Sequence, residues 1–427
     1  MTSQKSSSFN LKDEHKLKAH LIEAVTQKSQ GIPSSASAYQ EQILDWVHQA
    51  YDRSGLELDE PRREKIFRDV LAELVGYGPI QPLLDDPTIS EIMVSGPNQI
   101  YVERHGKLLD TNLTFDDDDH VMRIIDRILH PLGRQVNRDA PSADARLPDG
   151  SRVNIVIPPV AVDGPCITIR KFLDDKYSVE QLVDLGTLTP YMSEFLRACV
   201  VSRLNILITG NTSSGKTTLL NLLIGHIPNE ERIITIEDAA ELQLEQKYVV
   251  RLETKMPNVD GEGAVTARDL VHNALRMRPD RIVIGEVRGS EALDMLQAMN
   301  TGHEGSLTTL HANSPRDAIS RLETMSMMAG LELPLKAIRK QIISAVDLIV
   351  HMKRLIDGKR KIVRISEVPR MEGDVPTLSD IYKFEKTGLG PDGEILGEMI
   401  ATGLRPIFTP RLEVAGFKLG GEIFGAG

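Results

Sequence analysis

The spacing of hydrophobic residues first predicts helices. Between Ala38 and about Val75, apolar residues recur at intervals of three and four, which indicates two amphipathic helices interrupted by Gly55 and Pro61. The apolar positions are Ile43, Trp46, Val47, Tyr51, Ile66, Val70, Leu71 and Leu74. The preceding residues, 1 to about 35, are rich in Ser, Gln and Lys. We therefore expect residues 1–75 to form a mobile and partly helical N-terminal extension.

Residues 76–173 have a different pattern, in which short β-rich runs alternate with Gly, Pro and Asp turns. The expected strands are 91–94, 100–103, 153–157 and 167–170, and one helix is expected from Asp117 to about Leu132. This pattern predicts a small α+β domain. Four successive acids at 116–119 allow two interpretations, a metal site or a solvated helix N-terminus, and the second is favoured because negative charge is stabilised there.

The third stretch alternates strands with helices. Residues 174–190, which contain Gly186 and Pro190, are expected to be a linker. Beyond it we expect strands at 205–209, 233–236, 281–284 and 305–310 and helices at 216–224, 267–277 and 291–301. That order is typical of a parallel sheet built from βαβ units. Residues 191–427 are thus predicted to be an α/β domain, with a C-terminal subdomain of short strands beyond Leu355.

Composition restricts the class of protein. The chain has 427 residues, with 41% hydrophobic and 26% charged residues, which is a globular balance. The net charge of −11 argues against general attraction to DNA or anionic lipid, although it leaves room for a local basic site. Two cysteines, Cys166 and Cys199, exclude a disulfide scaffold and a CxxC zinc site. The sequence shows neither a secretory signal nor about 18 successive apolar residues, so we expect a cytoplasmic protein.

The most specific motif is GNTSSGKT at 210–217, which fits G-x-x-x-x-G-K-[ST] between an expected strand and an expected helix. Glycines allow the backbone to wrap around phosphates, and the helix N-terminus favours the same anions. Lys216 is expected to bridge the β- and γ-phosphates, and Thr217 to hold Mg²⁺. The predicted nucleotide-binding residues of this loop are Gly210, Asn211, Thr212, Ser213, Ser214, Gly215, Lys216, Thr217 and Thr218.

Two further expected strands end in carboxylates. RIVIGEVR at 281–288 places Glu286 at a strand end, where it can lie near Mg²⁺, through a water, and near the attacking water. ITIED at 234–238 places Glu237 and Asp238 at the same sheet edge. The alternatives are a surface acid for Glu286 and a helix cap for Asp238. The sequence leaves open whether Glu237 or Glu286 positions the water.

Two histidines, His303 and His311, flank the last of these strands. Zinc binding is disfavoured because neither cysteines nor H-E-x-x-H spacing accompany them. We expect them to contact the γ-phosphate region, and a structural histidine is the alternative for His303. An N-K-x-D element for guanine recognition is absent from the sequence, so ATP is the favoured nucleotide.

Taken in order, these four motifs resemble those of the type II/type IV secretion ATPase superfamily. Its Walker A, Asp, Walker B and His boxes correspond to 210–218, 236–238, 282–288 and 301–311. Segments 76–84 and 89–94 also resemble the start of its N-terminal domain. In detail, the stretches 323–330 and 401–406 resemble the Tad (Flp) pilus motor ATPases. The missing four-cysteine module excludes the secretin-type branch.

The resemblance implies a homo-hexamer of subunits with an N-terminal domain and a RecA-like ATPase domain, with ATP bound between the domains. It also implies that arginines of the N-terminal domain reach the phosphates, and the matching residues are Arg152, Arg170 and, less closely matched, Arg146. The alternative is that these arginines lie on the solvent face of strands. The residues predicted to be catalytic are Glu286, Glu237, Lys216, His311, Arg152 and Arg170.

These features together predict an ATP-hydrolysing motor that uses Mg²⁺ and powers pilus assembly or retraction. The resemblance places such a motor at the inner-membrane face of a bacterium, where it acts on membrane platform proteins without binding nucleic acid directly. One alternative is a conjugative or DNA-transfer ATPase of the same superfamily. Another is a nucleotide-gated scaffold that does not hydrolyse ATP.

Overall fold

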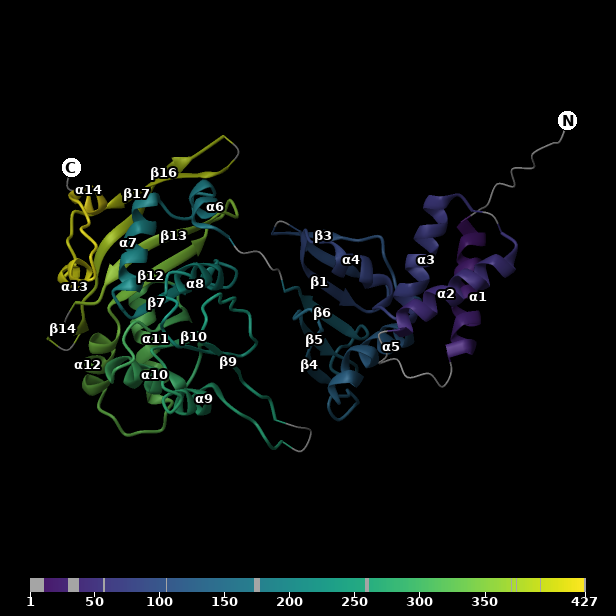
Figure 1. Ribbon diagram of the computed structural model, residues 1–427, viewed down its shortest axis with the longest axis horizontal. Coiled ribbons are helices and arrows are strands. Elements are labelled where there is room, and N and C mark those ends of the chain that lie inside the picture. The colour runs from purple at the N-terminus through teal and green to yellow at the C-terminus, as the bar shows by residue number, and fades with distance from the viewer. Residues whose placement is uncertain are drawn as a thin grey trace. The chain divides into compact units, whose positions relative to one another are not determined.

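The computed structural model describes residues 11–29, 38–56, 58–104, 106–172, 177–257, 261–369, 371–373, 375–391 and 393–425. The chain divides into two compact units, Met1–Asp174 and Asp175–Gly427, and each is described by itself. Figure 1 shows the course of the chain through both.

The first unit begins with three packed helices, α1 (Leu11–Ser29), α2 (Ala38–Ser54) and α3 (Glu60–Leu74). The helices predicted between Ala38 and Val75 are confirmed, and Asp59 caps α3 by accepting a hydrogen bond from the Arg62 amide. By contrast, α1 is a packed helix, because Leu17, Leu21 and Val25 line one face and are buried against α2 and α3. Residues 1–10 and 30–37 of the predicted extension lie outside the described residues.

The rest of the first unit is an antiparallel sheet covered by a helix. Within the described residues six strands follow the order β3 (Lys107–Asp110), β2 (Ile100–Arg104), β1 (Ile89–Ser95), β6 (Cys166–Arg170), β5 (Arg152–Val156) and β4 (Ser142–Arg146). Short helices η1 (Gly78–Ile80) and α4 (Gln81–Asp85) precede β1. Helix α5 (Asp118–Leu129), which continues into η2 (His130–Leu132), buries Ile124, Ile125 and Ile128 against the apolar face of this sheet.

The run of acids at 116–119 lies at the start of α5, as the favoured interpretation predicted. Asp117 is the N-cap and accepts a hydrogen bond from the His120 amide. His120 in turn connects this helix to the helical bundle, because its Nε2 lies 2.9 Å from Oε2 of Glu73 on α3. The side chain of Arg127 donates to the carbonyl oxygens of Glu73 and Gly76. The bundle and the sheet are therefore joined by polar contacts at the end of α3.

The second unit contains a large mixed sheet, which accounts for most of Figure 1's green and yellow strands. In the described part of the chain its nine strands follow the order β17 (Ile395–Ala401), β16 (Ser379–Leu389), β13 (Arg360–Glu367), β12 (Leu348–Arg354), β7 (Ile206–Gly210), β11 (Leu307–His311), β10 (Arg281–Val287), β8 (Ile233–Glu237) and β9 (Val249–Glu253). The strands from β12 to β9 are parallel to one another. The predicted parallel sheet is thus confirmed, with β13, β16 and β17 added in antiparallel pairing.

Helices cover both faces of this sheet. Along β7, Ile206 and Ile208 belong to a core with α7 (Pro190–Val201) and α8 (Lys216–Ile224), and Leu207 belongs to a core on the other face. The second core includes α9 (Ala267–Ala274), α10 (Glu291–Asn300), α11 (Pro315–Met327) and α12 (Leu335–Ala345). The remaining elements are α6 (Val179–Asp184), α13 (Thr409–Val414), α14 (Gly421–Phe424), β14 (Met371–Glu372) and β15 (Val375–Pro376).

The segment expected to be a linker, 174–190, is largely part of the second unit. A capping box at Ser178 starts α6, and Leu182 and Leu188 are buried in the core around α7 and α8. Because both leucines are buried, the segment packs against the core and does not form a free linker. Among the described residues, none of the helices combines the length and the hydrophobicity that a membrane-spanning segment requires.

Candidate nucleotide-binding site

The loop that is predicted to bind phosphate, called the phosphate loop below, connects β7 to α8. Gly210 ends the strand in very close contact with β12, because a Cβ atom added there would lie 2.5 Å from the carbonyl oxygen of Met352. Ser213 and Gly215 take positive φ angles of 57° and 95°, which turn the backbone into the start of α8. The glycines at 210 and 215 therefore allow the loop to fold tightly at the N-terminus of a helix, where anions are favoured.

The side chains of the loop are suited to phosphate. Ser214 is 1% exposed, and its hydroxyl lacks a hydrogen-bond partner within the described residues. The Nζ atom of Lys216 donates to the carbonyl of Asn211 at 3.1 Å, so the ammonium lies over the loop. Burial lowers the pKa of Lys216, and the charge of Glu286 acts in the opposite direction. Thr217 is exposed in the first turn of α8, where its hydroxyl is available to a cation.

Glu286 lies next to this loop and is connected to it through a histidine. Its Oε1 is 2.5 Å from Nδ1 of His311, and Nε2 of His311 is 2.9 Å from the Thr212 hydroxyl. Nε of Arg288 donates to the other carboxylate oxygen at 2.9 Å. Burial would raise the pKa of Glu286, but the hydrogen bonds from His311 and Arg288 and the charges of Arg288 and Lys216 hold it below its usual value. Glu286 is therefore kept ionised opposite Lys216.

Glu237 ends the neighbouring strand β8 in a different environment. One of its oxygens accepts hydrogen bonds from the amides of Glu241 and Leu242, both at 2.9 Å. The other oxygen is buried without a partner in the described part of the chain. Burial raises the pKa of Glu237, while these two backbone hydrogen bonds act in the opposite direction. The two carboxylates thus share one sheet edge, but only Glu286 is among the groups whose charge acts on Lys216.

Asp238 forms an ion pair instead of capping a helix. Its Oδ2 lies 3.1 Å from Nη1 of Arg288, so Arg288 contacts Asp238 as well as Glu286. Arg288 belongs to the predicted strand motif at 281–288, but no role was predicted for it. The sequence did contain a signal for this contact. Arg288 follows Glu286 by two residues, and alternate residues of a strand lie on the same face.

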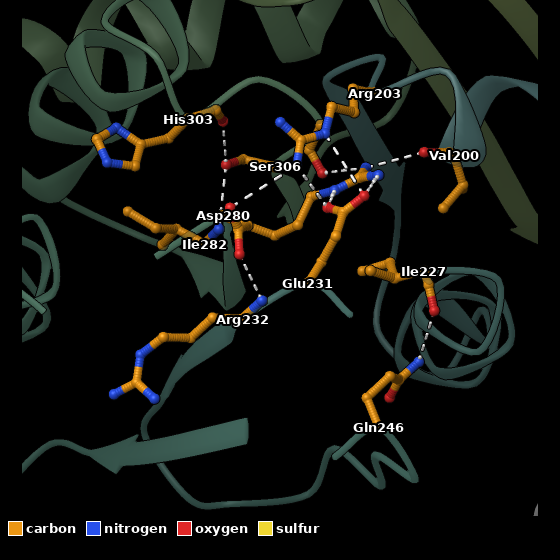
Figure 2. A network of polar contacts seen from close by, with 12 residues as sticks. Val200, Arg203, Ile227, Glu231, Arg232, Gln246, Asp280, Ile282, His303 and Ser306 are labelled. Carbon is orange, nitrogen blue, oxygen red and sulfur yellow. Dashed lines mark hydrogen bonds and ion pairs between the residues drawn. The ribbon is translucent and has the colours of Figure 1, made fainter. Parts of the chain in front are cut away.

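His303 does not join the group around the phosphate loop in this chain. It precedes β11, whereas His311 ends the same strand, so the two histidines lie at opposite edges of the sheet. Figure 2 shows His303 beside Ser306, whose hydroxyl donates to the His303 carbonyl at 2.7 Å. The prediction that placed both histidines near the γ-phosphate is therefore corrected for His303, since a five-residue strand separates the two sheet edges by about 16 Å.

A cavity of about 220 Å³ lies beside the start of α8. Three segments line it: residues near α6, the first turn of α8, and the turn between β12 and β13. The lining residues are Tyr177, Leu182, Leu185, Thr187, Gly215, Thr218, Leu219, Met352, Gly358, Lys359 and Arg360. Of these residues, only Gly215 and Thr218 belong to a predicted site motif. Leu219 follows them in α8, and the others come from separate segments that carry no local motif.

The three predicted phosphate-contacting arginines lie in one row of the first unit. Arg146 on β4 is directly opposite Arg152 on β5, which is opposite Arg170 on β6. Opposite residues of an antiparallel pair project from the same face. Arg170 also forms an ion pair with Glu91 at 2.7 Å, and Arg146 donates to the carbonyl of Gly150. The sheet register thus gathers three cations on one face.

Comparison with known proteins gives the family. The model of the family described as "Type II/IV secretion system protein" matches residues 73–375. A Mycobacterium tuberculosis protein, provisionally named a conjugal transfer protein, is 34% identical over 340 residues, which cover 78% of this chain and 96% of that protein. The type IV secretion system protein VirB11 of Bartonella quintana is 35% identical over 332 residues, and the match covers 67% of this chain and 90% of that protein.

Solved structures support the same fold. The crystal structure of the pilus retraction motor PilT with bound ADP matches 69% of this chain and 83% of that chain, with a TM-score of 0.50 and 20% identity. This similarity concerns the fold alone. Given the family match over residues 73–375 and the phosphate loop at the edge of a parallel sheet, the chain belongs to the type II/IV secretion system ATPase superfamily and has its RecA-like α/β fold.

Proposed function

We propose that this chain hydrolyses ATP and uses the energy as a motor of a pilus or secretion machine. The observation that carries the proposal is the connection between Glu286 and the phosphate loop, in which His311 contacts both the carboxylate and Thr212. An ionised carboxylate opposite Lys216, at the edge of a parallel sheet, is the arrangement that phosphoryl transfer to water needs.

The loop residues are assigned to binding. Lys216 exchanges its contact with the Asn211 carbonyl for the β- and γ-phosphates, and the buried Ser214 hydroxyl gains an acceptor there. Thr217 and Glu286, the latter through a water, would hold Mg²⁺, which supplies charge neutralisation on the phosphoryl oxygens when bound. The adjoining cavity is proposed to take the nucleoside part of ATP.

Glu286 is proposed to orient the attacking water, with Glu237 in a supporting role. The charge of Glu286 acts on Lys216, while Glu237 is partly occupied by two backbone amides. His311 fixes the rotamer of Glu286 and ties it to the loop. The arginine row of Arg146, Arg152 and Arg170 is proposed to contact phosphoryl oxygens, as a cluster of cations on one sheet face can.

The motor is proposed to act as a homo-hexamer on a membrane platform protein, at the cytoplasmic face of a bacterial inner membrane. The resemblance of 323–330 and 401–406 to Tad motors favours pilus assembly or retraction. Conjugal transfer is the second candidate, and the name of the M. tuberculosis relative favours it. The acidic net charge of −11 supports the first candidate, because it disfavours direct contact with DNA.

ATP turnover by purified Lys216→Ala and Glu286→Gln variants tests the assignment. Both should lose at least about a hundredfold in kcat, since each removes a group that acts on the transferred phosphoryl. Glu385→Gln, which changes an exposed carboxylate on β16, is the control and should leave turnover unchanged. Wild-type turnover in both site variants would exclude the proposed chemistry.

Two further measurements separate the alternatives. Stimulation of turnover by added DNA would favour conjugal transfer over pilus assembly. Tight ATP binding without turnover, even with a platform protein present, would favour the nucleotide-gated scaffold. Electron microscopy of the protein with ATP and Mg²⁺ tests the hexamer, and particles without six-fold ring views would count against it.

A further inference from the structure

The hairpin formed by β12 and β13 contacts the phosphate loop on the side opposite to Glu286. Strand β12 pairs with β7 so that Met352 lies opposite Gly210, at the start of the loop. At the other end of the loop, the Met352 methyl group would be 3.3 Å from a Cβ placed at Gly215. Arg360, the first residue of β13, completes this contact surface by donating its Nε–H to the carbonyl of Ser213 at 3.0 Å.

The Arg360 hydrogen bond fixes one peptide unit of the loop. The carbonyl of Ser213 and the amide of Ser214 belong to the same planar peptide unit, so the C=O and N–H bonds point in opposite directions. Arg360 holds the carbonyl end, and the Ser214 amide at the other end donates to the Asn211 carbonyl at 3.3 Å. Because this second bond is long, the amide can exchange it for a phosphate oxygen while Arg360 keeps the plane in place.

The backbone at this position needs such support. Ser213 has a φ angle of 57°, in the left-handed region that a residue with a Cβ seldom adopts. A cation on the outward-facing carbonyl also polarises the peptide unit, which strengthens the inward-facing amide as a donor to an anion. The contact spans 147 residues of sequence, so it depends on the tertiary fold and has no equivalent within the loop motif.

We infer that Arg360 is a positioning residue for nucleotide binding, which orients the Ser213–Ser214 peptide so that its amide can bind an ATP phosphate. Arg360 also lines the cavity proposed for the nucleoside, but its positioning role is exerted through the Ser213 carbonyl, and it has no assigned contact with the reacting atoms. The inference rests on the proposed ATPase function, and it adds to that function a residue outside the four sequence motifs.

Arg360→Leu and Arg360→Lys test the inference by separating KM from kcat. The leucine variant removes the donor and should raise KM, and the Kd for a fluorescent ATP analogue, about tenfold, while kcat stays within about twofold. The lysine variant keeps a charged donor and should recover most of the affinity. Arg364→Leu is the matched control, because Arg364 lies on the same strand but pairs with Asp380 on β16.

These measurements decide whether Arg360 positions the loop for ATP binding or only stabilises the fold. Equal affinity of Arg360→Leu and wild type, or equal losses in Arg360→Leu and Arg364→Leu, would overturn the inference. The inference would also be overturned if unfolding of Arg360→Leu, seen as a lower melting temperature, accounted for its lost ATP binding. The same holds if Arg360→Lys bound ATP as weakly as Arg360→Leu. If the wild type binds ATP without turnover, the proposed hydrolysis fails, and the Kd comparison still decides the role of Arg360. If it binds none, both fail.

Discussion

Replacing Arg281 with methionine removes a guanidinium group with 0% exposure at the start of β10. Its Nε lies 2.6 Å from Oε2 of Glu231, and its Nη1 donates to the carbonyls of Val200 and Gly305 at 2.8 and 3.0 Å. Figure 2 shows Glu231, Arg203 and Val200 gathered in this network. Methionine has a similar length and fills part of the volume, so the change mainly removes the polar contacts.

The expected loss of unfolding free energy is about 3 kcal/mol. Removing one partner of a buried ion pair typically costs about 3–5 kcal/mol, because the other charge stays buried without compensation. Glu231 keeps a second ion pair with Arg203 at 3.1 Å, so the lower end of that range applies. For a unit of this size, about 3 kcal/mol corresponds to a fall in Tm of about 6–12 °C.

The loss should shrink in acid. Burial acts to raise the pKa of Glu231, but the hydrogen bonds and charges of Arg281 and Arg203 hold it below its ordinary value of 4.5. A carboxyl group whose pKa is lower in the folded state adds stability above its ordinary pKa, and this stability disappears as the pH falls through the folded value. The difference between Arg281→Met and wild type should therefore be constant near neutral pH and decrease below pH 4.5.

Calorimetry of the full chain, together with ATP binding, is the assay. Arg281 begins β10 and the phosphate loop follows the opposite end of β7, so ATP affinity should match the wild type well below Tm. The control is Arg364→Met, which removes one partner of an exposed ion pair. Its free energy of unfolding should fall by less than about 1 kcal/mol. Adding Glu231→Leu to Arg281→Met should recover part of the loss. A Tm within about 2 °C of wild type would refute the reasoning.

Three further predictions concern other contacts. Gly210→Ala should abolish ATP binding, measured by titration calorimetry, because the new Cβ would lie 2.5 Å from the Met352 carbonyl; normal binding would contradict this. Glu73→Gln should destabilise the first unit by about 1–2 kcal/mol, seen as faster amide exchange in the bundle, since it weakens the contact with His120. Because hydrogen bonds and charges hold the pKa of Glu286 below 4.5, the pH dependence of turnover should show no inflection from Glu286 between pH 5 and 8.

The parts of the fold that were predictable from sequence are those with strong local signals. The buried strands at 205–209, 233–236 and 281–284 and the glycine-rich loop between β7 and α8 are each specified by a few adjacent residues. Strand β4 and helix α12 were missed. In the sequence SADAR only two alanines supply the apolar positions, and alanine favours strands weakly, so the segment becomes a strand because it pairs with β5.

The site was predictable to a similar extent. Motif spacing located Glu286 and His311 at one sheet edge, but it could not distinguish them from His303, which lies before the same strand. Arg360 and the other cavity residues of the β12–β13 hairpin are brought to the loop by strand order, which places β12 next to β7. Such contacts depend on tertiary pairing across more than a hundred residues, and a single sequence carries no direct record of it.

Mutations at the two edges of the large sheet should produce different phenotypes in a cell. Variants near Arg281 reduce the folded population, so proteases would remove the chain and the defect would be recessive, cured by one normal gene copy. Variants of Lys216 leave the core intact, so a full amount of inactive protein would remain. If copies assemble together as proposed, those inactive chains would enter mixed assemblies with normal ones and the allele would be dominant.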